Sequence, residues 1–569
     1  MRRVALTLLL AFPSTRVDAA PTELPKLARP ATQEIDAVFG EWDRTDRPGC
    51  SLGVYRDGEV LYARGYGMAN LEHGLANSAR TVFRIGSTSK QFTAAAVALL
   101  AEQGALSLDA DLREIFPELP DYGAPVTVRH LVHHTSGVRD YLTLAEVADW
   151  SEDYTIEEAL ELVLAQRELN FPPGERFLYS NSGYFLLSQV VEQVSGRTLR
   201  QWAAENLFGP LGMAGTHFHD DHTHIVPGRA AGYSPSADGY RIDQTVLDMV
   251  GDGGVFTTVE DLARWDRNFV DNRLGRGGPE LIRLLETPGR LADGSATDYA
   301  FGLAVGEHRG LRRIGHGGAF VGFRAAFDRF PDHHLSVAVL CNVSTSAPGS
   351  LALEVADLYL ADHLAPVPEA PEADPAAARE TTAGGVEEAE LRRAVGHYWN
   401  AEEGLVREIA LAGGRLFYVR SAESRNELAP LGDGRFRMLD VPVEVTVRFA
   451  AAGGGEGPRM TLEVAGEEPT TLERYEPARP SQEDLAALAG EWYSGELDAT
   501  RRLVLRDGGL VLEGRREDVA LRPVVPDVFA ADALVLRFRR APSGQVAELL
   551  VDAGRVRNLR FVRRAAPAG

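Results

Sequence analysis

A segment rich in proline, alanine and glutamate divides this chain into two parts. Residues 365–388 read APVPEAPEADPAAARETTAGGVEE and show no apolar periodicity, which is typical of a solvated, extended linker. The full length of 569 residues also exceeds what one hydrophobic core supports. We therefore expect a large domain over residues 20–364 and smaller units after the linker.

The part before the linker mixes strand and helix signals. Alternating runs predict strands at its beginning and end, and apolar residues at helical spacing predict helices between them. This order predicts an α/β layered domain whose sheet closes from distant parts of the chain. The runs are a hairpin at 51–55 and 60–65 around Arg56-Asp57-Gly58, helices from Lys90 to a stop at Gly104 and over 184–194 before Gly196, and paired strands at 323–330 and 335–343.

The part after the linker contains an internal repeat of short alternating strands. Residues 396–399 (GHYW) match 490–493 (GEWY), and 411–416 match 505–510. Two copies of this kind predict two small antiparallel barrels, at 389–476 and 481–567, because closure removes exposed sheet edges. The recurring aromatic residues are expected to pack in the barrel cores rather than stack on a ligand. They are Tyr398, Trp399, Trp492 and Tyr493.

The charge of the chain argues against two classes of partner. Its formal net charge is −23, whereas nucleic acids and anionic membrane surfaces require a basic footprint. Hydrophobic residues make up 44% and charged residues 25%, as in ordinary globular proteins. We expect a small molecule or a short peptide as partner, and the sequence indicates no oligomeric state.

The first residues predict export. MRRVALTLLLAFPSTRVDAAPT begins with two arginines, continues with a short apolar core and ends in small residues, as a signal peptide does. Cleavage is expected near Ala19 or Ala20, so residues 1–19 would be removed. No later run reaches about 18 apolar residues, so no membrane span is expected in the mature protein. The predicted location is the periplasm or the medium.

Two cysteines, Cys50 and Cys341, are present. Their spacing matches no zinc pattern, and both lie in apolar runs typical of strands. Buried free thiols are the favoured interpretation. A single cross-strand disulfide is the alternative, which an oxidising compartment would permit.

Lysine is almost absent, which makes Lys90 informative. The chain has 59 Lys and Arg together, yet lysine occurs only at Lys26 and Lys90. Ser87 precedes Lys90 by three residues at the start of a helical run, so both side chains lie on one face. A serine needs a neighbouring base, and lysine can accept a proton where arginine cannot. The pair therefore predicts a nucleophilic serine with a lysine proton partner.

Two further motifs accompany this pair. Residues 171–184 (FPPGERFLYSNSGY) place Tyr179 and Asn181 just before a helix, and His316-Gly317-Gly318 follows a run typical of a strand. With these motifs the chain, over about residues 40–362, resembles the serine β-lactamase and penicillin-binding-protein superfamily, most like its class C β-lactamase, esterase and D-aminopeptidase branch. The motifs that carry the resemblance are GSTSK (86–90), RHLVHHTSG (129–137), FPPGERFLYSNSGY, NLFGPLGM (206–213), GDGGVFTTVEDLARW (251–265) and GHGG (315–318).

The resemblance implies a β-lactamase-like catalytic domain, with an antiparallel sheet flanked by helices, and a role for each motif residue. Ser87 would be the acylated nucleophile, with Lys90 and Tyr179 as a coupled acid–base pair; the first proton acceptor of the two is left open. Asn181 would hydrogen-bond Lys90 and the substrate amide. The backbone N–H groups of Ser87 and Ala319 would form the oxyanion hole. His316 and Gly318, together with Asn181 and Ala319, would contact the substrate.

The third motif departs from the Lys-Thr-Gly of typical β-lactamases and carboxypeptidases. His316 stands where their lysine is and is only partly charged near neutral pH. This difference favours peptide or ester cleavage over β-lactam hydrolysis, and a D-aminopeptidase is favoured further because that type also carries two β-barrels. The alternatives are a β-lactamase or DD-carboxypeptidase, and a non-catalytic penicillin-binding sensor.

No cofactor or metal is expected. The histidine-rich run at 216–224 (THFHDDHTH) fits no regular face, and we interpret it as a polar surface loop rather than a metal site. His130, His133 and His134 are expected in a structural turn beside the site. We expect the barrels to support the catalytic domain, with one inter-strand loop narrowing the mouth of the active site.

Overall fold

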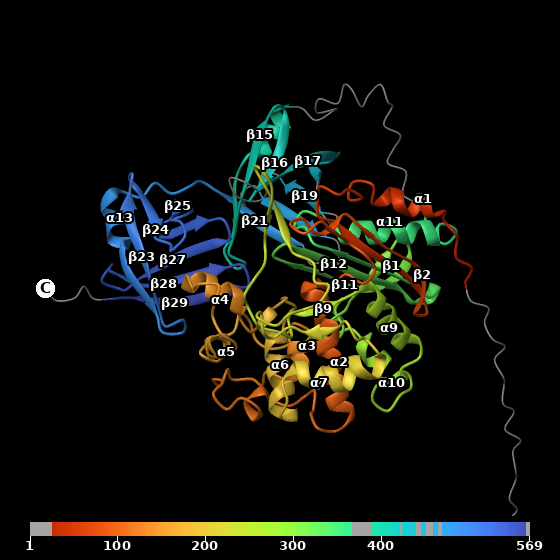
Figure 1. The fold of residues 1–569 in the computed structure, drawn as a ribbon. Helices are drawn as coiled ribbons and strands as arrows, with labels where there is room; N and C mark the ends of the chain where they lie inside the picture. The colour runs from red at the N-terminus through yellow and green to blue at the C-terminus, as the bar shows by residue number, and fades with distance from the viewer. Residues whose placement is uncertain are drawn as a thin grey trace, which may run out of the picture.

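The computed structural model describes residues 25–366, 388–420, 424–439, 445–450, 459–464 and 469–564. The predicted signal peptide and nearly all of the predicted linker lie outside the described residues. Residues 25–366 carry all of the predicted catalytic motifs, and we call them the catalytic part. This part and the two barrels pack side by side, with the second barrel beside helices α4 (Tyr141–Ala148) and α5 (Ile156–Leu164) (Figure 1).

A six-stranded antiparallel sheet forms the centre of the first part, in the order β10-β11-β12-β13-β1-β2. The first strand, β1, pairs with the last, β13, in the register Cys50↔Cys341 to Arg56↔Leu335. The predictions of an early hairpin, of late paired strands and of a sheet closed from distant segments are all confirmed. The strands are β1 (Cys50–Arg56), β2 (Glu59–Tyr66), β10 (Ala304–His308), β11 (Leu311–Phe320), β12 (Phe323–Phe330) and β13 (Leu335–Cys341).

Helices cover both faces of this sheet (Figure 1). Helices α1 and α11 pack on one face of the sheet. Helix α9 packs on the other face, and a layer built around α2 and α6 shares its hydrophobic core with α9. Residues 90–100 of α2 are all buried, as expected of a helix that is apolar nearly all round. The helices are α1 (Thr32–Val38), α2 (Lys90–Glu102), α3 (Val128–Val132), α4 (Tyr141–Ala148), α5 (Ile156–Leu164), α6 (Asn181–Ser195), α7 (Leu199–Ala203), α8 (Gly209–Leu211), α9 (Val259–Val270), α10 (Pro279–Leu285) and α11 (Pro348–Leu360).

Short elements connect the helical layer to the sheet. A three-stranded sheet in the order β5-β9-β6 brings the segment before Ser87 next to the segment after Asp252. The short elements are β3 (Met68–Asn70), β4 (Leu75–Ala76), β5 (Phe83–Arg84), β6 (His217–Phe218), β7 (Tyr233–Ser236), β8 (Gly239–Ile242), β9 (Val255–Thr257), and the single turns η1 (Gly86–Ser89), η2 (Leu112–Glu114), η3 (Ala204–Phe208) and η4 (Pro331–His333).

The two cysteines form a disulfide, so the favoured prediction of free thiols is wrong. Cys50 and Cys341 are direct partners in the β1–β13 ladder, and their Cα atoms lie 4.0 Å apart. Sequence reasoning placed each cysteine in a strand but could not decide the pairing. The register that brings residues 291 positions apart face to face exists only in the closed sheet.

Two closed eight-stranded antiparallel barrels follow the linker, as the repeat predicted. We call them barrel 1 (β14–β21) and barrel 2 (β22–β29); each is preceded by a short helix, α12 (Glu388–Ala394) or α13 (Gln482–Leu488). Barrel 1 has β14 (Gly396–Asn400), β15 (Leu405–Ala412), β16 (Arg415–Val419), β17 (Arg425–Gly432), β18 (Arg435–Met438), β19 (Val445–Ala450), β20 (Arg459–Val464) and β21 (Thr470–Tyr475). Barrel 2 has β22 (Gly490–Ser494), β23 (Ala499–Arg506), β24 (Gly509–Leu512), β25 (Val519–Pro523), β26 (Val528–Ala531), β27 (Leu534–Arg540), β28 (Val546–Ala553) and β29 (Val556–Arg563).

The repeated aromatic residues divide into two pairs. Tyr398 and Trp492 are 1% and 0% exposed and belong to the barrel cores, as predicted. Trp399 and Tyr493 follow them by one residue and therefore point out of their barrels. Trp399 packs in a small apolar cluster between the barrels, and the Tyr493 hydroxyl donates to Asp498. The prediction of core packing is wrong for this second pair.

Barrel 2 shares its hydrophobic core with the catalytic part. Leu144 and Val147 of α4 and Leu162 of α5 belong to the same buried cluster as Trp492 and the other inward-facing residues of barrel 2. Helix α4 therefore closes one end of this barrel.

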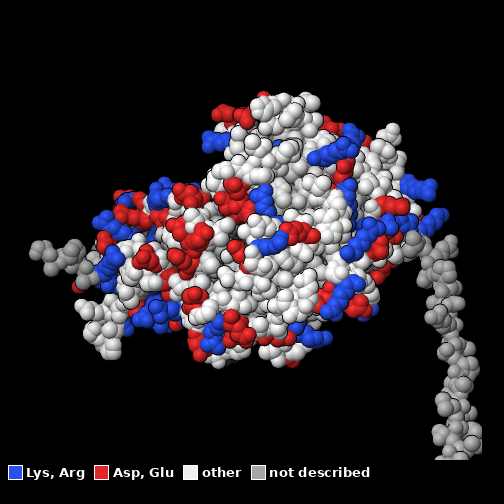
Figure 2. All heavy atoms as spheres, turned by 60° about the horizontal axis from the view of Figure 1, so that its bottom comes forward, with Lys and Arg blue, Asp and Glu red and all other residues white. Residues whose placement is uncertain are grey.

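Charged residues of both signs lie on the face of the molecule that Figure 2 shows. On the face that Figure 2 shows, lysine and arginine side chains are interspersed with aspartate and glutamate. Among the residues that the structure describes, no helix is both long and apolar enough to cross a membrane.

Candidate active site

The nucleophile segment fits closely against strand β11. The turn η1 carries Ser87 from β5 into α2, and the hydroxyl of Thr88 donates to the carbonyl of His316 over 3.1 Å. Gly86 has a φ of +49°, and a Cβ atom on it would lie 2.8 Å from the backbone nitrogen of Ala319. A Cβ atom on Gly318 would lie 1.9 Å from the carbonyl oxygen of Ile85. Glycine is therefore required at both positions, and it brings the Ala319 nitrogen next to the nucleophile.

Lys90 is completely buried and is held by three acceptors. Its Nζ atom donates to Ser87 Oγ over 3.2 Å, to Asn181 Oδ1 over 3.0 Å and to the carbonyl of Asp252 over 2.5 Å. Three acceptors match the three N–H donors of an ammonium group. The structure thus brings together Ser87, Lys90 and Asn181, which are predicted site residues from two separate motifs.

Tyr179 enters this network through its ring. The ring centroid lies 4.8 Å from Lys90 Nζ, and the residue lines the same cavity as Ser87. No hydrogen bond joins the Tyr179 hydroxyl to another described residue. The ring of His134 packs against Tyr179 at 4.2 Å, and His134 Nδ1 accepts the N–H of Ser180. This places His134 in a supporting turn, as expected.

Two aspartates were missed by sequence reasoning. Asp140 is fully buried, accepts the Asn181 N–H over 2.7 Å and caps α4 through Thr143, so it fixes the start of two helices. Asp252 holds Lys90 through its backbone carbonyl and accepts the Tyr141 hydroxyl. Both lie in motifs that carried the resemblance or directly follow one, which was the available signal. Their partners at the site, Asn181 for Asp140 and Lys90 for Asp252, are however more than 40 residues away in the sequence.

His316 is neutral in this site. Burial, together with the charge of the nearby Lys90, lowers its pKa to about 4. Its Nδ1 contacts the carbonyl of Gly317 at 2.5 Å, and its Nε2 contacts the Tyr299 hydroxyl at 3.0 Å. A neutral ring with the proton on Nδ1 satisfies both contacts, since Nε2 then accepts from the tyrosine. The third motif therefore supplies no permanent cation.

A cavity of about 720 Å³ lies over these residues. Ser87, Tyr179, Asn181, His316, Gly318 and Ala319 all line it, so the predicted site residues meet at one place, with Lys90 beneath. Part of the wall comes from barrel 2: Arg555, in the turn between β28 and β29, lines the cavity. Its guanidinium lies 4.9 Å from the Tyr179 ring and 3.6 Å from an oxygen of Asp140. A barrel loop therefore reaches the active site, and its effect on the width of the mouth stays a prediction.

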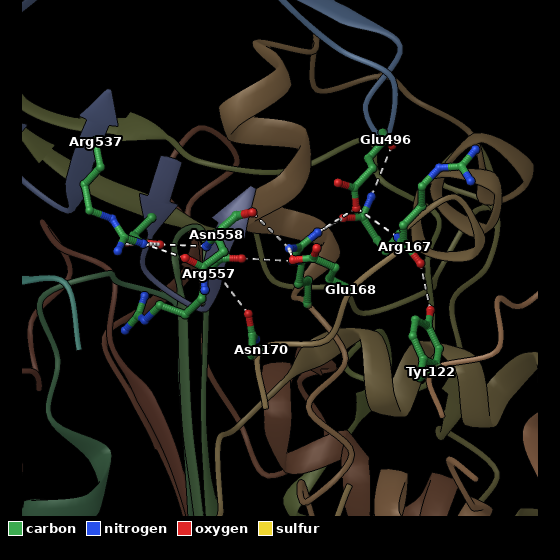
Figure 3. Close-up of polar contacts among 11 residues, drawn as sticks. Tyr122, Arg167, Glu168, Asn170, Glu496, Arg537, Arg557 and Asn558 are labelled. Atoms are coloured by element: carbon green, nitrogen blue, oxygen red, sulfur yellow. Dashed lines mark hydrogen bonds and ion pairs between the residues drawn. The ribbon is translucent and has the colours of Figure 1, made fainter. Parts of the chain in front are cut away.

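The turn that carries Arg555 is clamped by the catalytic part. The Asn170 side chain donates to the carbonyl of Arg555 and accepts the N–H of Arg557, as Figure 3 shows for the second contact. The completely buried guanidinium of Arg139 donates to the carbonyls of Arg557 and Asn558 and pairs with Glu496 at 2.7 Å. These contacts make barrel 2 a fixed part of the active-site wall.

No residue of the histidine-rich run lines the cavity. His217 is half-buried and His219 is 2% exposed, so the interpretation as a surface loop holds only for its later residues. His222 pairs with Asp248. Burial lowers the pKa of His217 to about 4 and that of His219 to about 3. Within the described ranges, no group of three or more His, Cys, Asp or Glu residues is placed to hold a metal ion.

Comparisons with known proteins extend over nearly the whole chain. The family model described as Beta-lactamase matches residues 35–361. The D-aminopeptidase of Gluconobacter oxydans is 30% identical over 482 residues, which cover 82% of this chain and 83% of that protein. The D-aminopeptidase of Cereibacter sphaeroides is 28% identical over 544 residues, covering 93% and 97%. The solved structure of the octameric penicillin-binding protein homologue from Pyrococcus abyssi has a TM-score of 0.54 at 25% identity, and the match covers 78% of this chain and 98% of that one.

Proposed function

The chain belongs to the beta-lactamase family and is a D-aminopeptidase-like serine hydrolase, and we propose that it releases N-terminal D-residues from short peptides or cleaves closely related small amides and esters. The similarity to D-aminopeptidases, which covers 93% of the chain in one case, supports this substrate class. The observation that carries the chemistry is the hydrogen bond of 3.2 Å between Lys90 Nζ and Ser87 Oγ at the floor of an open cavity.

The geometry supports an acyl-enzyme mechanism. Ser87 Oγ attacks the carbonyl carbon of the substrate while its proton passes to the acid–base pair of Lys90 and Tyr179. The oxyanion that forms is held by the backbone N–H groups of Ser87 and Ala319. As the C–N bond breaks, the pair returns the proton to the leaving amine. Water then attacks the ester on Ser87 by the same route and releases the acid.

The neutral His316 supports the choice of substrate. A substrate carboxylate that a lysine in this motif would bind finds no permanent charge there, because the pKa of His316 is lowered to about 4. Efficient hydrolysis of β-lactams and a DD-carboxypeptidase activity are therefore less favoured than aminopeptidase or esterase activity.

Replacement of the nucleophile tests the mechanism. We expect S87A to abolish hydrolysis of D-aminoacyl p-nitroanilides and p-nitrophenyl esters, and to abolish labelling by a fluorophosphonate. The matched control is S107A, an exposed serine outside the cavity, which should retain both. Activity that survives S87A would show that the nucleophile is wrongly assigned.

A substrate panel tests the class. D-Aminoacyl anilides should be cleaved faster than their L-isomers and faster than nitrocefin. Preference for nitrocefin would identify a β-lactamase instead. A long-lived β-lactam adduct in intact-mass spectra, without turnover of any substrate, would identify a penicillin-binding sensor.

We also propose that the protein is exported to the periplasm or the medium. The signal-like residues 1–19 support this, and so does the disulfide between Cys50 and Cys341, because such bonds persist in oxidising compartments. The expected result is an extracytoplasmic protein whose intact mass corresponds to cleavage near Ala19 or Ala20. A full-length protein confined to the cytoplasm would contradict the proposal.

A further inference from the structure

The cavity over Ser87 is basic, although the chain as a whole is strongly acidic. The chain has a formal net charge of −23, yet three arginines and one carboxylic acid line this cavity. The acid is Asp252, and burial raises its pKa. The three arginines are Arg84, Arg324 and Arg555. A cavity of this kind favours an anionic ligand.

Arg84 differs from the other two arginines because it has no polar partner. Arg324 donates to the carbonyls of Val321 and Phe323, and Arg555 pairs with Asp140. No described residue accepts a hydrogen bond from the Arg84 side chain, and no described carboxylate lies within 4 Å of it. Its Nε atom is inaccessible and without a partner, and the whole residue is only 5% exposed.

A buried, unpaired guanidinium is unusual. Buried polar groups are almost always hydrogen-bonded, and a buried charge without a partner destabilises the fold. The Arg84 guanidinium lies over two aromatic rings, 5.1 Å from the centroid of Phe320 and 5.8 Å from that of Phe256, and these contacts compensate for the missing partner only in part. Burial lowers its pKa to about 10, so it stays charged at neutral pH. An anion in the cavity would give the guanidinium the counter-ion that it lacks.

The position of Arg84 identifies the part of the substrate that it faces. Phe320, which Arg84 contacts, follows the oxyanion residue Ala319 at the end of β11. His316, which lies near Tyr179, is four residues earlier in this extended strand, or about 13 Å away. The leaving group must lie within reach of Tyr179, which returns its proton. Arg84 therefore faces the opposite side, where the acyl group lies.

We propose that Arg84 forms an anion subsite on the acyl side of Ser87, which binds the carboxylate of an acidic acyl group such as an N-terminal D-glutamyl or D-aspartyl residue. Arg84 is a specificity-determining residue in this proposal. The D-aminoacyl part rests on the proposed function, whereas the preference for an anion rests on the cavity alone.

The first test compares two substrates that differ in one charge. Wild-type protein should cleave D-glutamyl p-nitroanilide about 10- to 100-fold more efficiently than D-glutaminyl p-nitroanilide, mainly through KM. R84M should remove this preference by weakening cleavage of the acidic substrate, and R84K should retain part of it. The control R80M removes an arginine that is exposed and lies outside the cavity. It should leave the efficiency of cleavage of both substrates unchanged.

A merely structural role of Arg84 predicts a different result. In that case both substrates would lose activity by the same factor in R84M and R84K. The same conclusion would follow if wild-type protein showed no preference between the two anilides. Either result would overturn the proposal.

The second test needs no turnover. In wild-type protein, glutarate should slow the labelling of Ser87 by a fluorophosphonate, whereas glutaramide should not. In R84M, the labelling rate should be the same with either compound. Protection by glutarate in a protein that cleaves no D-aminoacyl substrate would support the subsite and refute the D-aminopeptidase function. D-Aminoacyl cleavage without protection in wild-type protein would refute the subsite and leave the function standing.

Discussion

Barrels 1 and 2 share one topology but have different relations to the active site. Both are closed eight-stranded barrels that begin with a short helix and a glycine. The described core of barrel 1 contains residues of that barrel and of α12 alone. The core of barrel 2 continues into α4 and α5 of the catalytic part, and its β28–β29 turn reaches the cavity. The two barrels therefore differ in role because their contacts with the catalytic part differ, although their strand order is the same.

The ion pairs that join each barrel to the catalytic part differ in the same way. Arg139 and Glu496, which hold barrel 2, have side chains that are 0% and 10% exposed. Arg176 and Glu403, which join barrel 1, are 37% and 33% exposed. A buried pair cannot lose one partner without leaving an uncompensated charge, whereas a half-exposed pair can be replaced by water. Barrel 2 is therefore expected to be the indispensable one.

The largest difference between the two barrels is expected when the arginine of each ion pair is removed. R139M should lower the free energy of unfolding by about 3–5 kcal/mol, because Glu496 stays buried without its partner. R176M should lower it by at most about 1 kcal/mol. Urea unfolding of both variants measures the difference. Equal losses would mean that the two barrels are attached in the same way.

Leucine truncations separate stability from activity. L144A in α4 and L416A in barrel 1 each remove a buried side chain and should each cost about 2–5 kcal/mol. Only L144A should also lower kcat/KM, because α4 begins at Tyr141, which lines the cavity. Measurements at a temperature where both variants are folded test this. A comparable loss of kcat/KM in L416A would show that barrel 1 also shapes the site.

Acidification should weaken the catalytic part before the barrels. Burial lowers the pKa of His133 to about 4 and that of His134 well below its usual range, whereas the same side chains in the unfolded chain titrate near 6.5. The unfolded state therefore binds more protons as the pH falls, and His133 alone should cost about 2 kcal/mol between pH 7 and pH 5. Residues 389–564 contain one histidine, His397. Hydrogen exchange at the two pH values should show the loss in residues 25–366, and a loss confined to the barrels would contradict it.

The smallest expected effect is that of the cation at the tip of the turn. R555A removes a guanidinium that packs over Tyr179 and is 42% exposed. Its buried partner Asp140 keeps the hydrogen bonds from Asn181 and Thr143, so stability should change little. We expect kcat/KM to fall about two- to fivefold as the tyrosine loses this contact. R415A, on the surface of barrel 1, is the matched control and should have no effect. If R555A and R415A had the same kcat/KM, the contribution of barrel 2 to the site would be structural only.

Sequence reasoning succeeded where the signal is local. The hairpin around Asp57, the helix after Lys90 and the repeat of the barrels follow from periodicity and turn residues within short windows. It failed where a distant partner decides the outcome. The cysteine pairing depended on the sheet register, and the outward direction of Trp399 and Tyr493 depended on which face of each strand became the interior.

The sequence by itself determined the reactive group of this protein: a serine and a lysine three residues apart at a helix start lie on one face whatever the rest of the chain does. The tertiary structure alone decided the character of the cavity around them. Arg84 lies three residues before Ser87, but Asp252, Arg324 and Arg555 come from three distant segments, and only packing places them around the same nucleophile. The charge of a site depends on distances in space, and those distances are not encoded in any short stretch of residues.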